Sequence, residues 1–391
     1  MQSPQVKLYK DRNLQIVFGV TLMAVLGVSS ITPAFPRIVE ELNISRTDVG
    51  MLITAFTLPG VFLSPFIGIL ADRFGRKRIL LPSLFLFALA GMACALNKDF
   101  DTLIALRAVQ GIGAAGLGAL SLTILADLYL GSRRAEAMGL NASVLSIGTA
   151  SYPLIGGALA TLAWNYPFFL PLAAIPIGIF ALFGLHYPEP RSAEGLREYL
   201  GSAWGYMKNI RAIGAFMGGF VIFIILYGSV LTYLSLYLGL SFGAPPFIIG
   251  LILSSMSITT GIVSSQLGRM IKSVSITNLA KLGFVAYAIG LALLPFMPQL
   301  GLVVIPVVIF GLGMGLAVPT LQTYIAGLAP SEYRAAFMSI NATMLWLGQT
   351  AGPLIFGLIY TRANFDGVFL YGAVPAAATA VVGFIGGKLI R

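Results

Sequence analysis

Uninterrupted apolar runs of roughly 20 residues recur along this 391-residue chain and constrain its fold more than any other feature. Only 10% of the residues are charged and 58% are hydrophobic, whereas an ordinary soluble domain carries roughly 25% charge. A backbone that crosses lipid must satisfy its own polar groups, and these runs are continuous instead of alternating. The sequence therefore predicts an all-α integral membrane protein.

The apolar runs predict twelve membrane-spanning helices, and a polar connection between the sixth and seventh divides the chain. The approximate spans are 14–38, 48–71, 78–96, 101–128, 135–162, 166–187, 211–239, 246–269, 276–296, 300–326, 333–361 and 367–389. We expect an N-terminal six-helix bundle (1–188), a cytoplasmic linker (189–210) and a C-terminal six-helix bundle (211–391). Apolar linker residues at helical spacing predict either a short helix on the membrane surface or an extension of span seven. These residues are Leu196, Leu200, Trp204 and Met207.

The distribution of basic residues sets the predicted orientation. Of the 24 Lys and Arg residues, nineteen fall on one side of the membrane when both termini lie there, four fall on the other, and Arg107 lies within a span. Because cytoplasmic loops carry the excess of basic residues, we predict a multi-pass protein of the inner (plasma) membrane with both termini cytoplasmic. The net charge of +10 does not indicate nucleic-acid binding, since the basic residues are spread over short loops.

Side chains that could carry catalysis or bind a metal are scarce. The single cysteine, Cys94, lies within an apolar run, and the single histidine, His186, lies at a predicted helix end, so neither an intrachain disulfide nor a cysteine metal site is expected. The sequence has no G-x-x-x-x-G-K-[ST] loop for a nucleotide. We expect no cofactor and no enzymatic activity, and a monomer surrounded by membrane lipid.

One charged turn interrupts the apolar pattern more sharply than any other. The segment 68–78, Gly-Ile-Leu-Ala-Asp-Arg-Phe-Gly-Arg-Lys-Arg, places five charges within seven residues. Both flanks are long enough to cross a bilayer, so the turn belongs at a membrane surface, and its four cations favour the cytoplasmic side. Gly75 allows a tight turn, and Asp72 among so many cations is expected to have a partner.

The spacing of this turn resembles G-x-L-a-D-R-x-G-R-K, the signature between helices two and three of the major facilitator superfamily of secondary transporters. The resemblance covers the whole chain and implies two pseudo-symmetric six-helix bundles with a site between them near the midplane. It also implies a gating charge relay between the turn and an acid at the end of helix four. The residues assigned to the relay are Gly68, Asp72, Arg73, Gly75, Arg76, Lys77 and Asp127. The alternative for Asp127 is a local pair with Arg133 or Arg134.

The two halves of the chain are related in sequence. With a shift of 200 residues and no gaps, 110–170 aligns with 310–370 at about twenty identities in sixty-one positions. Residues present in both halves are interpreted as scaffold, whereas residues in only one half are better functional candidates. Arg107 aligns with Val307 and Asp127 aligns with Gly327, so both are candidates.

Arg107 begins a segment that resembles R-x-x-Q-G-x-G on helix four of the superfamily, to which a role in proton coupling is attributed. The proton-coupling candidates are Arg107, Gln110 and Gly111. An ionised group at membrane depth costs several kcal/mol, so Arg107 is expected to face a cavity or a partner. The alternative is an arginine that reaches the outer surface, since Asp101 lies only six residues away.

A third motif lies on the fifth predicted helix and resembles G-x8-G-x3-G-P-x2-G-G, which is associated with antiporters of the superfamily. Its members are Gly139, Gly148, Pro153, Gly156 and Gly157, with Tyr152 in place of the expected glycine. Small residues allow another helix to approach closely, and proline bends the helix. The segment from Leu26 to Pro36 also resembles the first helix of twelve-helix drug exporters.

No Asp, Glu, Lys or His lies near the middle of a predicted span, so the expected substrate cavity is neutral and aromatic. Its candidate residues are Phe56, Asn141, Tyr227, Tyr233, Gln322, Tyr324, Asn341, Trp346 and Gln349. Such a wall suits a lipophilic substrate held by stacking and a few hydrogen bonds. The leading hypothesis is alternating-access export of hydrophobic or amphipathic molecules in exchange for protons. A lipid-like or specific-metabolite carrier or flippase is the alternative; a non-transporting receptor or a membrane enzyme is a third interpretation with little support.

Overall fold

The computed structural model describes residues 8–185, 209–328 and 334–389, which form helices joined by short connections, with no β-strand among them. The N-terminal group contains η1 (Leu8–Lys10), α1 (Arg12–Ser29), η2 (Thr32–Ala34), α2 (Phe35–Glu41), η3 (Asp48–Gly50), α3 (Met51–Phe74), α4 (Arg76–Leu96), α5 (Phe100–Ala114), α6 (Leu117–Leu128), α7 (Gly131–Leu162), η4 (Tyr166–Ala173) and α8 (Ala174–Gly184). The C-terminal group contains α10 (Ile210–Ile224), the π-helical η5 (Ile225–Leu234), α11 (Ser235–Phe242), α12 (Pro246–Met270), α13 (Ile276–Leu293), η6 (Leu294–Phe296), η7 (Leu300–Val303), α14 (Val304–Leu328) and α15 (Arg334–Leu389).

Eleven helical segments among the described residues are long and apolar enough to cross a membrane. The last of them, Phe337–Val382, has 46 residues and would be roughly 70 Å long, more than twice the thickness of the hydrocarbon core. Asn364 has a φ of 53° and a ψ of −160°, which divides α15 into two helices. The segments therefore agree with twelve crossings, and the predicted all-helical membrane fold is confirmed.

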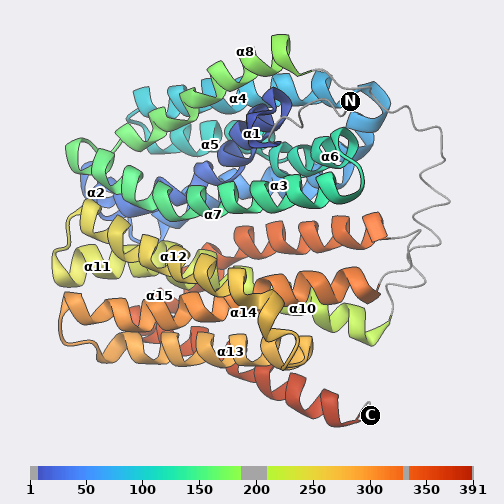
Figure 1. Ribbon diagram of the computed structural model, residues 1–391. Coiled ribbons are helices and arrows are strands. Elements are labelled where there is room, and N and C mark those ends of the chain that lie inside the picture. Colours follow the sequence, from blue (N-terminus) through green and yellow to red (C-terminus); the bar gives the residue numbers. More distant parts are fainter. Residues whose placement is uncertain (1–7, 186–208, 329–333, 390–391) are drawn as a thin grey trace.

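The helices are arranged as two groups that lie one above the other in Figure 1, with α1–α8 in the upper group and α10–α15 in the lower. The end of α8 and the start of α10 lie on the right of this view, which we call the linker side, and the opposite end is the far side. Both ends of α15 lie on the linker side, as a helix that turns back at Asn364 requires. The predicted linker helix lies outside the described residues.

The two groups approach each other most closely in the far half of the molecule. Helix α7 packs against α12, and α3 packs against α15. The backbone of Gly157 in α7 lies so close to the carbonyl of Pro246 that a Cβ would not fit, and Gly250 in α12 lies equally close to the carbonyl of Pro153. Such close approach of backbones allows extensive dispersion contacts between the groups there.

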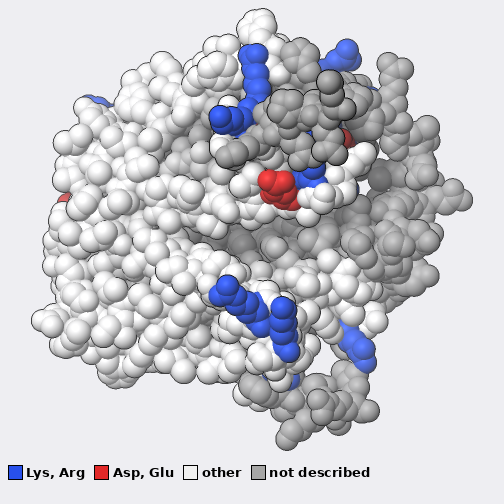
Figure 2. Space-filling view, viewed as in Figure 1, with Lys and Arg blue, Asp and Glu red and all other residues white. Residues whose placement is uncertain are grey.

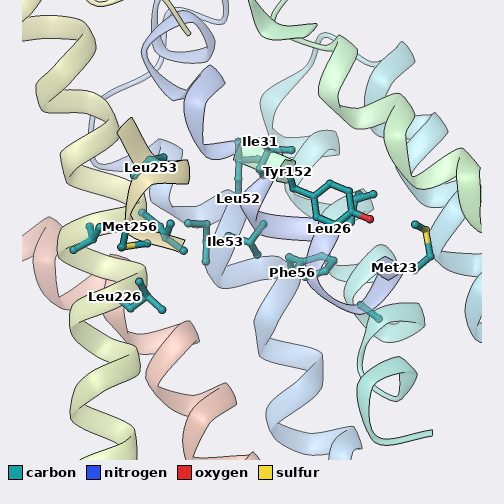
Figure 3. Close-up of a cluster of buried hydrophobic side chains, with 14 of the residues drawn as sticks. Met23, Leu26, Ile31, Leu52, Ile53, Phe56, Tyr152, Leu226, Leu253 and Met256 are labelled. Atoms are coloured by element: carbon teal, nitrogen blue, oxygen red, sulfur yellow. The ribbon is translucent and has the colours of Figure 1, made fainter. Parts of the chain in front are cut away.

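A continuous apolar cluster also joins the two groups. Figure 3 shows that side chains from both groups meet in it. The N-terminal group contributes Met23, Leu26, Ile31, Leu52, Ile53, Phe56 and Tyr152, and the C-terminal group contributes Leu226, Leu253 and Met256. All of these side chains are buried. The far half of the molecule is therefore closed by packed apolar side chains.

The linker side differs in charge and in shape. In Figure 2 the Lys and Arg side chains visible on this face gather toward the linker side. The surface between the two groups is hollowed there, whereas it is filled where α7 meets α12. The two groups thus touch in the far half, and a hollow lies between them at the surface toward the linker side (Figure 2).

Candidate functional site

The charged turn connects α3 to α4 through a single residue. Gly75 caps the end of α3 and precedes the first residue of α4, and its φ of +99° is a conformation that residues with a Cβ rarely adopt. This backbone turn places Arg76 at the start of α4 with its side chain directed into the group. Gly68, six residues before the end of α3, has open space where a Cβ would lie.

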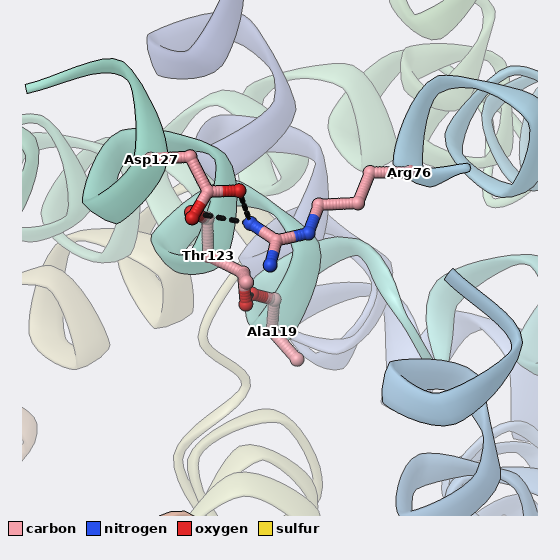
Figure 4. Close-up of polar contacts among 4 residues, drawn as sticks. All are labelled: Arg76, Ala119, Thr123 and Asp127. Atoms are coloured by element: carbon pink, nitrogen blue, oxygen red, sulfur yellow. Dashed lines mark hydrogen bonds and ion pairs between the residues drawn. The ribbon is translucent and has the colours of Figure 1, made fainter. Parts of the chain in front are cut away.

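Arg76 forms an ion pair with Asp127, close to the end of α6 (Figure 4). The same Nη1 donates to the backbone oxygen of Thr123 at 2.8 Å. The Arg76 side chain is 8% exposed and that of Asp127 is 26% exposed, so the pair is partly shielded from solvent. Of the two partners considered for Asp127, the turn is the one that the structure pairs with it. The pair joins α4 to α6 at the linker side of the N-terminal group.

Other residues of the turn make local contacts. Lys77 Nζ donates to the backbone oxygen of Leu185, at the end of α8, at 3.2 Å. The guanidinium of Arg73 lies 5.7 Å from the ring centre of its neighbour Phe74. The side chain of Asp72 lies outside the described part of the chain, so its predicted partner stays a prediction. The turn therefore ties α4 to both α6 and α8.

Arg107 is the most deeply buried cation of the described residues, at 1% exposure. Its guanidinium donates to three oxygens from three helices: Nε to Leu52 O at 3.0 Å, Nη2 to Gly27 O at 2.9 Å and Nη1 to Gln110 Oε1 at 2.6 Å. The guanidinium carbon also lies 4.1 Å from the ring centre of Phe56. This burial excludes the alternative of an arginine that reaches the outer surface in this conformation.

The helices around Arg107 are held at close spacing. Gln110 Nε2 donates to the backbone oxygen of Phe87 in α4 at 3.4 Å, so the amide links Arg107 to a fourth helix. Gly111 in α5 lies against the carbonyl of Phe56 in α3, where a Cβ would not fit. The three predicted coupling residues thus lie together, and the charge of Arg107 is solvated by neutral oxygens and an aromatic face.

The glycines of the fifth-helix motif have unequal surroundings. Gly156 lies against the carbonyl of Ser30, next to α1, and Gly157 lies against that of Pro246 in α12, both too close for a Cβ. Gly148 faces the side chain of Leu22 at 2.8 Å from a built Cβ, and Gly139 faces open space. The far end of the motif therefore packs against both groups, while its linker-side end does not.

The nine cavity candidates occupy several environments in this conformation. Three are buried in helix packing: Phe56 lies beside Arg107, Asn141 accepts a hydrogen bond from Thr21 Oγ1 at 2.8 Å, and Tyr233 stacks on Tyr360 with ring centres 5.2 Å apart. Trp346 lies across the group boundary against Gly60 of α3. Gln349, in the same part of α15, is partly buried.

Two further candidates share a recess in the C-terminal group. Gln322 of α14 and Asn341 of α15 line it together with Phe223 of α10, and Tyr227 stacks on Phe223 with ring centres 5.8 Å apart. Tyr324, two residues after Gln322 in α14, lines a different hollow within the same group. The nine residues therefore do not meet around one pocket here, and their role as a substrate cavity stays a prediction.

Hydroxyl groups that the sequence did not single out connect the two groups. Thr350 Oγ1 in α15 donates to Thr57 Oγ1 in α3 at 2.9 Å, and Thr54 Oγ1 donates to the backbone oxygen of Thr350 at 3.0 Å. Nearer the far side, Arg46 Nη1 donates to the hydroxyl of Tyr360 at 2.8 Å. Threonine is common in membrane helices, and nothing in its sequence spacing indicates a partner nearly 300 positions away.

The arrangement is suited to conformational change. Among the described residues, no group of three or more His, Cys, Asp or Glu side chains could hold a metal ion. The polar groups that the structure brings together hold helices at defined spacings, in two clusters at different depths. Such clusters can stabilise one of two packings of the same helices.

Three known proteins that are similar to this chain over most of its length are named as an exporter or as resistance proteins. A bacillibactin exporter of Bacillus subtilis (strain 168) is 28% identical over 373 residues, covering 90% of this chain and 91% of the relative. Multidrug resistance protein 1 of the same organism is 27% identical, covering 90% of each chain. Tetracycline resistance protein, class B, of Escherichia coli is 26% identical, again covering 90% of each chain.

Solved structures share the fold at low sequence identity. A crystal structure of a variant of the nucleoside transporter NupG has a TM-score of 0.81 at 16% identity, covering 96% of this chain and 99% of that chain. A bacterial homologue of the human lysosomal transporter Spinster, inward-facing and unoccupied, has a TM-score of 0.78 at 16% identity, covering 97% and 96%. The family model of the Major Facilitator Superfamily matches residues 17–344 and, in a second overlapping match, residues 229–388. The chain belongs to the major facilitator superfamily, whose members are membrane transporters.

Proposed function

We propose that this transporter exports hydrophobic or amphipathic small molecules across the inner membrane by alternating access, in exchange for protons. The observation that carries the proposal is the asymmetry between the two halves of the molecule: backbones touch in the far half, while the surface between the groups is hollowed on the linker side. Relatives named as exporters and resistance proteins support the direction of transport.

The charge distribution relates this asymmetry to the membrane. The linker side carries the predicted cytoplasmic excess of basic residues, so a molecule parted on that side is open to the cytoplasm. Export then requires a second packing in which the contacts of Gly157 and Gly250 separate and the linker side closes. A substrate drives this exchange only through a difference in its affinity for the two packings.

Arg107 and the turn have separate roles in the proposal. Arg107 is the coupling residue in the proposal because neutral groups, and not a carboxylate, hold its charge. A proton gained or lost nearby therefore changes the free energy of the buried guanidinium. The Arg76–Asp127 pair keeps the linker-side ends of α4 and α6 together as one unit that closes against the C-terminal group. Both roles require that the N-terminal group moves as a body.

The direct test uses purified protein in lipid vesicles with an imposed pH gradient and a fluorescent lipophilic dye. We expect dye movement that follows the sign of the pH gradient and stops when an ionophore removes it. Movement at equal rate without a gradient would refute proton exchange, and the absence of movement for a panel of lipophilic dyes would refute this substrate class.

Arg107→Ala separates coupling from binding. We expect gradient-driven transport to be lost while dye binding to detergent-solubilised protein is retained. Ile112→Ala is the matched control, because Ile112 lies on the same helix but is 44% exposed on the surface of the protein. Unchanged transport by the Arg107 variant would reduce the arginine to a packing role.

Alternating access has its own test at the α7–α12 contact. Gly157→Ala introduces a Cβ where the Pro246 carbonyl lies, so the far half should open, whereas Gly139→Ala has space for the added group. Spin labels at Ser45 and Asp366, in a background without Cys94, report the far-side separation of the two groups. A wider distance distribution is expected for Gly157→Ala alone, and equal distributions would contradict a far-side gate.

A carrier or flippase for a lipid-like or specific metabolite is the second candidate. It is favoured by the sequence position of the carboxylates, none of which lies near the middle of a predicted span to bind a cationic drug. A competition panel of lysolipids against drug cations distinguishes the two. Inhibition of dye transport by lysolipids at concentrations at which cations have no effect would favour the lipid-like substrate.

A further inference from the structure

A hollow of about 520 Å³ lies inside the C-terminal group, apart from the boundary between the two groups. Its walls come from α10, α13, α14 and the second part of α15. We call it the C-terminal hollow. Its volume falls within the range of small-molecule sites. No residue of the Arg107 cluster or of the Arg76–Asp127 pair lines it, and of the nine predicted cavity residues only Tyr324 does.

The walls of the C-terminal hollow are amphipathic. Phe284 and Leu321 belong to its largely apolar lining, whereas Arg211 and Lys281 bring two cations to the same space. Arg211 is the second residue of α10 and Lys281 is the sixth residue of α13, so both lie within about two helical turns of the linker side. Among the described lining residues none is acidic. The hollow therefore combines an apolar interior with positive charge at the depth of lipid headgroups.

The corresponding part of the N-terminal group is filled. Gly19 of α1 packs against Ile177 of α8, and Gly178 of α8 packs against Phe85 of α4. The side chain of Arg12, at the start of α1, lies against Gly184 at the end of α8. In the C-terminal group the last turns of α15 point away from α13 instead (Figure 1). The hollow is thus a feature of one half and is not required by the repeated scaffold.

We propose that the C-terminal hollow binds an anionic phospholipid, with the phosphate between Arg211 and Lys281 and an acyl chain against Phe284 and Leu321. Basic pockets between membrane helices on the cytoplasmic side are suited to anionic headgroups. Charge complementarity favours a phosphate over a zwitterionic headgroup, and the apolar interior favours a chain-bearing lipid over free phosphate. This site does not depend on what the protein transports, and a bound lipid joins α10 to α13 and α14.

The test measures lipid retained by the full-length protein after delipidation, by mass spectrometry of the intact protein in detergent. The probes are phosphatidylglycerol, phosphatidylcholine, oleate and inorganic phosphate. We expect the wild type to retain phosphatidylglycerol and the double variant Arg211→Gln/Lys281→Gln to bind it roughly thirtyfold more weakly. The double variant Arg269→Gln/Lys272→Gln removes the same charge from the end of α12 and the turn that follows it, and should bind as the wild type does.

A second variant tests the hollow itself without changing charge. Gly214 lines the hollow and has nothing within 4 Å of a built Cβ, so Gly214→Leu fills the space and favours the helix. This variant should lose phosphatidylglycerol retention. Retention of phosphatidylglycerol by both variants at the wild-type level would overturn the site. So would retention of phosphatidylcholine equal to that of phosphatidylglycerol in the wild type, or binding of oleate or phosphate without phosphatidylglycerol. Because no readout involves transport, this failure is distinct from a failure of the proposed function.

Discussion

Arg107 and Arg76 are both buried arginines of the N-terminal group, yet their charges are balanced in opposite ways. Arg76 lies at the linker side and pairs with the carboxylate of Asp127. Arg107 lies at depth, and its partners are the carbonyl oxygens of Leu52 and Gly27, the amide of Gln110 and the ring of Phe56. One site is a charge pair, and the other is a charge held by dipoles.

The difference follows from depth. An ion pair near the membrane surface retains some solvent access and can break and reform as helices move. Farther into the helical group, a carboxylate partner would neutralise the charge of Arg107, whereas the neutral oxygens found there solvate that charge and leave it uncompensated. The proposed function assigns gating to Arg76 and coupling to Arg107, and substitution tests that assignment.

Replacement of each arginine by lysine should separate the two sites most strongly. Arg107→Lys loses the planar fork that reaches three helices, so gradient-driven transport should fall roughly tenfold to a hundredfold. Arg76→Lys keeps a cation beside Asp127 and should lose about twofold to threefold. Initial rates in vesicles, normalised to folded protein from size-exclusion chromatography, give the comparison. Similar losses for the two variants would show that transport does not depend on whether the arginine is held by neutral oxygens or by a carboxylate.

The Arg107 site should also depend on helix spacing. Gly111→Ala forces α5 away from the Phe56 carbonyl of α3 and so lengthens the hydrogen bond from Arg107 to Leu52. Transport should decrease roughly fivefold to tenfold, as expected for overpacking between helices. Gly118→Ala is the control on α6, because a built Cβ there meets only Ala24 at 3.8 Å. If both variants transport alike, the spacing of α5 and α3 is not part of the mechanism.

The sequence predicted the spans and the charged turn because both signals are local. Hydropathy is summed over about twenty residues, so errors at single positions average out, and Gly75 within a run of charged residues indicates a turn. The partners of Arg107 carry no such signal, since carbonyl oxygens occur at every residue and only helix packing selects those of Leu52 and Gly27. The same holds for the contact between Thr57 and Thr350. The π-helical η5 also follows from packing that composition does not reveal, whereas the break at Asn364 falls between the predicted spans 333–361 and 367–389.

The Arg76–Asp127 pair should show a moderate coupling. With side-chain exposures of 8% and 26%, the pair lies between exposed and buried cases, so a coupling free energy of about 1 to 2 kcal/mol is expected. The measurement is a double-mutant cycle of Arg76→Gln, Asp127→Asn and the double variant, from thermal unfolding in detergent. Additive effects on stability would mean that the pair is not formed in the dominant conformation.

The smallest effect is expected for a charge that is fully exposed on the far side. Asp99 caps α5, and hydrogen bonds from the hydroxyl and amide of Thr102 lower the pKa of its carboxylate. Because the pKa is lowered on folding, the stabilisation is present at neutral pH and is lost as the pH falls through the folded-state pKa, below the ordinary range near 4.

Asp99→Ala should therefore lower the unfolding temperature slightly at pH 7, by about 1 °C, and the difference from wild type should shrink at pH 3. Asp101→Ala removes one negative charge at the same helix end, so an equal loss in both variants would attribute the effect to charge alone and not to the cap. A loss as large as that of the Arg76 variants would contradict the ordering of these charges by depth.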